Sequence, residues 1–177
     1  LVSNATTLVT TAILGVPMLE GVKMPGMREL MVRSGQEALD AGALSGYPVL
    51  PIFGLSPDDM RQTNRLVEKL LDTLLDGFVL PHTKTTVLQD WIKGRHSEID
   101  ELNDLVAAEH EKRGGAAAFN RAVVEIARRI ERGELSPGPV PKRCSARVAV
   151  AAPARGVSPR VQRRSRKPSN SNTKAEN

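Results

Sequence analysis

The sequence of 177 residues has few of the residues that cross-linking, metal binding and covalent catalysis usually require. A single cysteine, Cys144, excludes a disulfide framework and a cysteine-based metal site. The three histidines, His82, His96 and His110, lack metal-ligand spacing, so we expect them to be ordinary surface or capping residues. Glycine-rich nucleotide loops, HExxH and GxSxG are also missing, which removes the obvious catalytic signatures.

Long apolar runs are absent as well. No stretch approaches the roughly 20 residues of a membrane span, and the start shows no signal-peptide pattern. The sequence therefore predicts a cytoplasmic protein with no membrane partner.

Charge is distributed unevenly along the chain. Residues 1–135 hold 15 basic and 19 acidic residues, a net charge of −4, and all five aromatic residues. Residues 136–177 hold 10 basic residues and one acidic residue, a net charge of +9. The sequence thus predicts a folded domain over 1–135 and a basic tail over 136–177 that buries too little to become ordered.

Apolar residues recur at helical spacing through most of the first 135 positions. Apart from the ambiguous segment 1–14, no run alternates between apolar and polar residues with the period of two that a strand would show. The fold class is therefore predicted to be all-α, with six helices. The predicted helices are residues 1–14, 25–41, 57–79, 85–93, 97–113 and 117–132.

Two of these helices differ in how clearly they are signalled. The helix at 57–79 has Ser56 as N-cap, Pro57 at its first position and two aspartates in its first turn. The segment 1–14 is rich in threonine and valine, which favours a strand. Its apolar residues also fit a helical stripe, and the surrounding helices decide for a helix.

Two polar residues stand out as candidates for binding. Ser97 is placed to cap the helix at 97–113, with Asp100 at capping-box distance, so Glu98 lies in the first turn. Glu98 is then either a ligand contact or helix-end electrostatics. If 1–14 is a helix, Asn4 shares one face with Leu8. Asn4 is then either a ligand contact or a satisfied core asparagine.

A longer pattern changes the balance between these alternatives. It comprises T-V-L-Q-D at 86–90, K-G-R at 93–95, S-E-I-D at 97–100 and Asn103. This run resembles the S-M-L-Q-D…G-R-x-T-E-I-D-x-L-N signature of ketopantoate reductases (2-dehydropantoate 2-reductases). The opening L-V-S-N-A and the late F-N-R at 119–121 resemble further motifs of that family. The resemblance covers roughly residues 1–133.

The resemblance implies the helical C-terminal domain of an oxidoreductase, of the ketopantoate reductase and 6-phosphogluconate dehydrogenase C-terminal-like type. Such enzymes, which serve pantothenate biosynthesis, transfer a hydride from NADPH to a 2-keto acid. Matched residue by residue, Asn4 and Thr86 would bind the substrate and Glu98 would reach the cofactor. The family's catalytic lysine would precede Leu1, and its Rossmann domain is not in this sequence, so we expect this chain by itself to be inactive.

The sequence departs from the family's pattern at two positions. Leu8 and Met18 replace family asparagines, which favours a 2-keto acid less polar than ketopantoate.

The alternative to a reductase portion is a non-enzymatic, truncated domain kept for dimerisation, and a homodimer fits either interpretation. The basic run at 160–167 could contact nucleic acid, but no aromatic residue accompanies it, so no nucleic-acid partner is expected.

Overall fold

The computed structural model describes residues 1–139, without the side chains of residues 63 and 64. Every regular element in this described part is a helix, so the predicted all-α class is confirmed there. The elements are α1 (Val2–Ala12), α2 (Met18–Gly21), α3 (Met27–Leu44), α4 (Pro57–Arg61), α5 (Thr63–Gly77), α6 (Thr86–Ile92), the π-helix η1 (Asp100–Asp104), α7 (Leu105–Glu111) and α8 (Ala118–Glu131).

Helix α1 is the central element of the core despite its strand-like composition. Ala5 and Val9 are fully buried, and α1 contacts α3, α5, α6 and α8. Its four threonines each donate a hydrogen bond to the carbonyl four residues earlier, at 2.6–2.9 Å. These bonds satisfy the buried hydroxyls, so the β-branched side chains can pack inside a helical bundle. The prediction of a helix over a strand is therefore correct.

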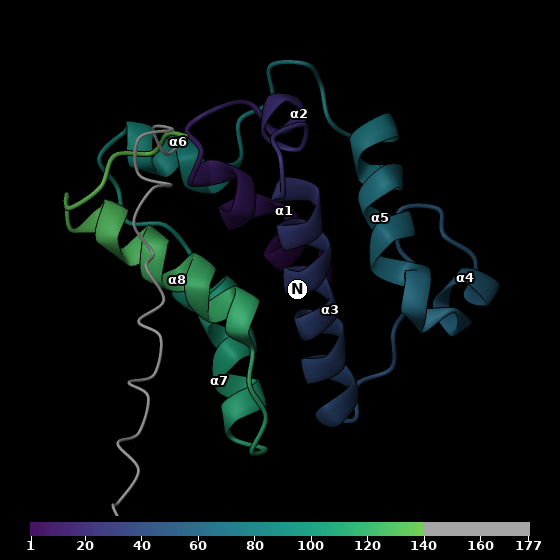
Figure 1. Cartoon of the computed structure of the whole chain (residues 1–177). Coiled ribbons are helices and arrows are strands. Elements are labelled where there is room, and N and C mark those ends of the chain that lie inside the picture. Colours follow the sequence, from purple (N-terminus) through teal and green to yellow (C-terminus); the bar gives the residue numbers. More distant parts are fainter. Residues whose placement is uncertain (140–177) are drawn as a thin grey trace, which may run out of the picture. The chain divides into compact units, whose positions relative to one another are not determined.

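Helix α3 lies between two groups of helices. Figure 1 shows α8 and α7 on one side of α3 and α5 and α4 on the other, and α3 contacts α5, α7 and α8. The largest core cluster includes Met31 of α3, Leu71 of α5 and Val123 of α8, each fully buried. A second cluster joins α4 and α5 through Met60, Leu66 and neighbouring residues.

The predicted helix at 57–79 is divided into two. Its start is as expected, because Ser56 and Asp59 form a capping box ahead of Pro57. Gln62 then leaves helical geometry, with φ −89° and ψ 62°, and separates α4 from α5. This bend lets Met60 pack in the same cluster as Leu66. The predicted apolar stripe begins only at Leu66, after Gln62, so the sequence gave no sign of the break.

The predicted helix at 97–113 also begins differently. Helical structure starts only at Asp100, as a π-helix that continues into α7, and no side chain caps it. The expected capping box is wrong. The Ser97 hydroxyl instead donates to Glu131 at 2.7 Å, and Asp100 accepts a hydrogen bond from Arg128 at 2.9 Å. Ser97 and Asp100 therefore bind residues of α8 and do not bind each other's backbone as a capping box would require.

A buried amide pair joins α1, α3, η1 and α8. Asn103 donates to the Ala5 carbonyl at 3.1 Å and to Asn120 Oδ1 at 2.8 Å. Asn120 in turn donates to the Ser34 carbonyl at 3.0 Å and to Glu37 at 2.6 Å. Both asparagine side chains are fully buried. Since buried polar groups require partners, this network fixes how the four elements meet.

The end of the described part lies against α1, because Gly138 N–H donates to the Ile13 carbonyl at 3.0 Å. The chain separates into two units, Leu1–Val140 and Pro141–Asn177. The predicted domain boundary at 135/136 stays a prediction. The basic tail that was expected to be disordered falls, beyond residue 139, outside the described residues. None of the described helices has the length and apolar character needed to cross a membrane.

Candidate functional site

Asn4 lies on the exposed surface of α1, within its first turn. Within the described part of the chain, the Asn4 side chain makes one hydrogen bond, which is long: the Ser3 hydroxyl donates to Oδ1 at 3.5 Å. This exposure excludes the alternative that Asn4 is a satisfied core asparagine. The amide is therefore open to solvent.

Thr86 is the first residue of α6 and is exposed. Its neighbour Thr85 is the N-cap, and the Thr85 hydroxyl accepts a hydrogen bond from the Leu88 N–H at 3.2 Å. Val87 and Leu88 are buried in the largest core cluster. These neighbours therefore cap the helix and anchor it in the core, and neither role depends on the exposed Thr86 side chain.

Glu98 is exposed and lies two residues before η1. Within residues 1–139, its carboxylate takes part in no hydrogen bond and no ion pair. The alternative that Glu98 serves as helix-end electrostatics is therefore weakened, because the first helical turn begins with Asp100 and Glu101 instead.

The three predicted site residues come from adjoining elements. Helix α1, which carries Asn4, contacts α6, which carries Thr86, and also contacts η1, which follows Glu98. No hydrogen bond of the described residues joins Asn4, Thr86 and Glu98 to one another. They are three exposed polar groups around α1 and not a preassembled catalytic cluster.

The two apolar replacements take part in the fold. Leu8 is half-buried against the largest core cluster, and Met18 is buried, only 5% exposed. Met18 also starts α2, where its N–H donates to the Thr83 carbonyl at 2.9 Å. Neither side chain can offer the hydrogen bonds of an asparagine to a ligand.

A partly buried carboxylate that the sequence did not single out lies close to α6 and to the segment before η1. Glu131, the last residue of α8, accepts hydrogen bonds through Oε1 from Trp91 Nε1 at 3.0 Å, from Ser97 N at 2.9 Å and from Ser97 Oγ at 2.7 Å. The His96 ring lies 3.5 Å from Oε2. Burial raises the pKa of Glu131, but these hydrogen bonds outweigh it, so the pKa lies below its ordinary value. The carboxylate is ionised at neutral pH.

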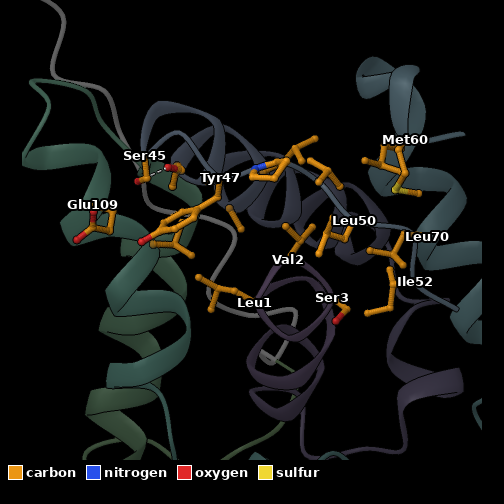
Figure 2. Close-up of a pocket in the computed structure, with 18 of the residues that line it drawn as sticks. Leu1, Val2, Ser3, Ser45, Tyr47, Leu50, Ile52, Met60, Leu70 and Glu109 are labelled. Carbon is orange, nitrogen blue, oxygen red and sulfur yellow. Dashed lines mark hydrogen bonds between the residues drawn. The ribbon is translucent and has the colours of Figure 1, made fainter. Parts of the chain in front are cut away.

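An open cavity lies elsewhere on the domain. It has a volume of about 510 Å³ and opens between the start of α1, the end of α3, the segment 47–55 and α5. Figure 2 shows Ser45, Tyr47 and Glu109 at one end and Met60, Leu70 and Ile52 at the other. Asn4, Thr86 and Glu98 do not line it.

The rim of this cavity is apolar and open to solvent. Tyr47 and Leu50 are each 72% exposed, and Leu1 and Ile52 are about half exposed. Glu109 supplies a charge at one end, where Lys112 and Arg113 bind it and hold its pKa below the usual range. A contiguous apolar rim of this kind is typical of a surface that meets another molecule.

The described residues do not meet the requirements of a metal site. Among residues 1–139, no three histidine, cysteine, aspartate or glutamate side chains gather closely enough to hold an ion. His110 is buried and its Nε2 lies 2.7 Å from the Glu37 carbonyl, whereas the His96 side chain is 90% exposed.

These features define an all-α domain that presents isolated polar side chains around one central helix. The family model described as the C-terminal domain of ketopantoate reductase PanE/ApbA matches residues 1–131. The chain therefore belongs to this family, and the resemblance seen in the sequence is confirmed.

One solved structure supports the fold. It is a PanE/ApbA family ketopantoate reductase from Ralstonia eutropha JMP134, with a TM-score of 0.57 and 23% sequence identity. The match covers 75% of this chain and 39% of that protein, so this chain spans well under half the length of the relative. No curated protein matches the sequence.

Proposed function

We propose that this chain is the substrate-binding helical portion of a 2-dehydropantoate 2-reductase-like oxidoreductase. The observation that carries the proposal is that Asn4, Thr86 and Glu98, which match the family's binding positions, are all exposed and contribute little to the fold. Polar side chains without structural tasks are suited to bind a ligand.

Each side chain suits the role that the family gives it. The Asn4 amide can donate to and accept from a 2-keto acid, and the Thr86 hydroxyl can donate to its carboxylate or keto oxygen. The exposed Glu98 carboxylate can accept hydrogen bonds from the hydroxyl or amide groups of NADPH. The cofactor, when bound, would supply the hydride that reduces the keto carbon. We place this reaction in the cytoplasm.

The replaced residues set the substrate class. Because Leu8 and Met18 are apolar and pack into the domain, a less polar 2-keto acid should bind at least as well as ketopantoate itself. A suitable pair for comparison is 2-dehydropantoate and 3,3-dimethyl-2-oxobutanoate, which lacks only the terminal hydroxyl.

Titration of the isotope-labelled chain with both acids, with and without NADPH, tests the proposal by NMR. We expect the amide signals of Asn4 and Thr86 to shift, and Asn4→Ala and Thr86→Ala each to weaken binding about fivefold. Thr73→Ala on α5 is the matched control and should bind like wild type. Binding that survives both site substitutions, or no binding to either acid, would refute the proposal.

The second candidate is a non-enzymatic domain that self-associates. The apolar rim around the 510 Å³ cavity is the observation that favours it. Light scattering after size exclusion distinguishes the two candidates. A dimer that Leu50→Asp converts to a monomer while 2-keto acid binding is absent would support this alternative.

A further inference from the structure

Glu131 occupies a position that disfavours a carboxylate. It is the last residue of α8, where the helix dipole places partial negative charge, and its side chain is only 13% exposed. Both burial and the dipole oppose an ionised carboxylate there, so partners elsewhere must stabilise it.

Those partners come from two separate segments. Trp91 belongs to α6, and Ser97 lies beyond the turn that follows α6. Trp91 is five residues after Thr86 on the same helix, and Ser97 directly precedes Glu98. One oxygen, Oε1, thus receives donors from both segments that carry candidate site residues.

A second contact between α8 and this segment lies after Glu98 in the sequence. Arg128 donates to Asp100 Oδ1 and to Asp104 Oδ2, each at 2.9 Å. The stretch from Ser97 to Asp100 is therefore fastened to α8 at both ends. Glu98 lies between the two attachments with its own side chain exposed.

We propose that Glu131 is a positioning residue for this site. Its carboxylate holds α6 and the stretch before η1 against α8, and so fixes Thr86 and Glu98 relative to each other. The inference deepens the proposed function and rests on it for the roles of Thr86 and Glu98. Glu131 itself touches neither substrate nor cofactor.

The chemistry requires an acceptor at this position. Three N–H or O–H donors converge on one oxygen, and a carboxylate oxygen is the strongest acceptor a side chain can offer them. An alanine leaves all three donors without this partner, whereas a glutamine keeps one carbonyl oxygen of similar reach. Replacement by glutamine should therefore restore part of what alanine removes.

The 177-residue chain can be tested directly, because Trp91 is its only tryptophan. The variants are Glu131→Ala, Glu131→Gln and the control Glu125→Ala, which removes an exposed carboxylate from the same helix. Each is examined by circular dichroism, Trp91 fluorescence, the amide NMR signals of Thr86 and Glu98, and titration with 2-dehydropantoate and with NADPH.

We expect Glu131→Ala to keep its helix content, change Trp91 emission and shift the Thr86 and Glu98 signals together. Affinity for the probes should fall about tenfold, Glu131→Gln should lie between this variant and wild type, and Glu125→Ala should match wild type. Altered Trp91 emission with unchanged Thr86 and Glu98 signals would overturn the inference.

Two further results are also decisive. If Glu131→Ala does not fold, Glu131→Gln must show smaller shifts of the same paired signals with weaker binding, and wild-type behaviour would overturn the inference. If the wild-type chain binds neither probe, the proposed function fails, while paired shifts of Thr86 and Glu98 would still support Glu131 as the residue that positions them.

Discussion

The two sides of this domain are held together in different ways. On the side of α8, the buried amides of Asn103 and Asn120 and the partly buried carboxylate of Glu131 make directional hydrogen bonds. On the side of α4 and α5, the second core cluster is apolar and borders the 510 Å³ cavity. The candidate residues Thr86 and Glu98 lie on segments tied to the polar side.

This contrast indicates where the fold can support a site of defined geometry. Hydrogen bonds between buried groups specify one arrangement, because any shift leaves a donor or acceptor unsatisfied. Apolar contacts beside open space tolerate rearrangement, since atoms facing a cavity have fewer neighbours to lose. We therefore expect substitutions to cost more in the filled core than beside the cavity.

The largest expected effect tests this contrast with two adjacent leucines of α5. Leu71 is fully buried in the main cluster, and Leu70 lines the cavity. Leu71→Ala should lower the free energy of unfolding by about 4 kcal/mol and Leu70→Ala by about 2 kcal/mol, because the cost grows with the new empty volume. Urea unfolding followed by circular dichroism measures both, and equal losses would contradict the contrast.

Two glycines of α3 give the next comparison. A Cβ at Gly35 would lie against Thr6 Oγ1 and Val67 Cγ1, both on packed helices, whereas a Cβ at Gly42 would meet nothing within 4 Å. Gly35→Ala should destabilise the domain by about 3 kcal/mol through overpacking.

Gly42→Ala is its matched control, because it adds the same methyl group to the same helix. It should stabilise the domain by about 0.5 kcal/mol, since alanine favours the helical backbone. Thermal unfolding by calorimetry separates the two signs. A stabilised Gly35→Ala would mean that α1, α3 and α5 pack less tightly than described.

A smaller loss is expected from the buried amide network. Asn120→Ala would remove the hydrogen bonds that this side chain makes with Asn103, Glu37 and the Ser34 carbonyl, and should lower the free energy of unfolding by about 2 kcal/mol. The control Asn4→Ala removes the same amide from an exposed position and should change stability by less than about 0.5 kcal/mol. Chemical denaturation of both variants checks the difference.

The smallest effect concerns pH. Hydrogen bonds from Lys69 and from Ser56 lower the pKa of Asp59 from 3.8 to about 2. Because the folded pKa is the lower one, this stabilisation is complete above about pH 3.8 and is lost as the pH falls through about 2.

Asp59→Asn should therefore flatten the dependence of unfolding on pH in this acid range. Asp76→Asn, at an exposed position of α5 without an ion pair among the described residues, serves as the control. Urea unfolding between pH 2 and 5 is the measurement, and the same slope in the Asp59→Asn variant and wild type would contradict the assignment.

Much of the fold could be predicted because helical signals are local. Apolar spacing located α5 and α8, and the Ser56 cap with Pro57 located the start of α4. The break at Gln62 and the π-helix at Asp100 were not predictable in this way. Both involve partners distant in sequence, because Met60 packs in one cluster with Leu39 of α3 and Asp100 accepts a hydrogen bond from Arg128 of α8.

The candidate site, too, could be predicted from the sequence only in part. Asn4, Thr86 and Glu98 were found from a family motif, which concerns residue identity and spacing. Their exposure, which excludes a core role for Asn4, required coordinates. Glu131 carried one local sign, a carboxylate at the end of a predicted helix, but nothing in the sequence linked it to Trp91 or Ser97.

The all-α class and the family of this chain follow from the amino-acid sequence, because periodicity, capping and motif spacing are properties of neighbouring residues. The folded arrangement was needed to show that Ser97 donates to Glu131, 34 residues away, and that Trp91 donates to the same carboxylate across 40 residues. Donors bind the acceptor that packing brings within about 3 Å, whatever the separation of the two residues in the sequence.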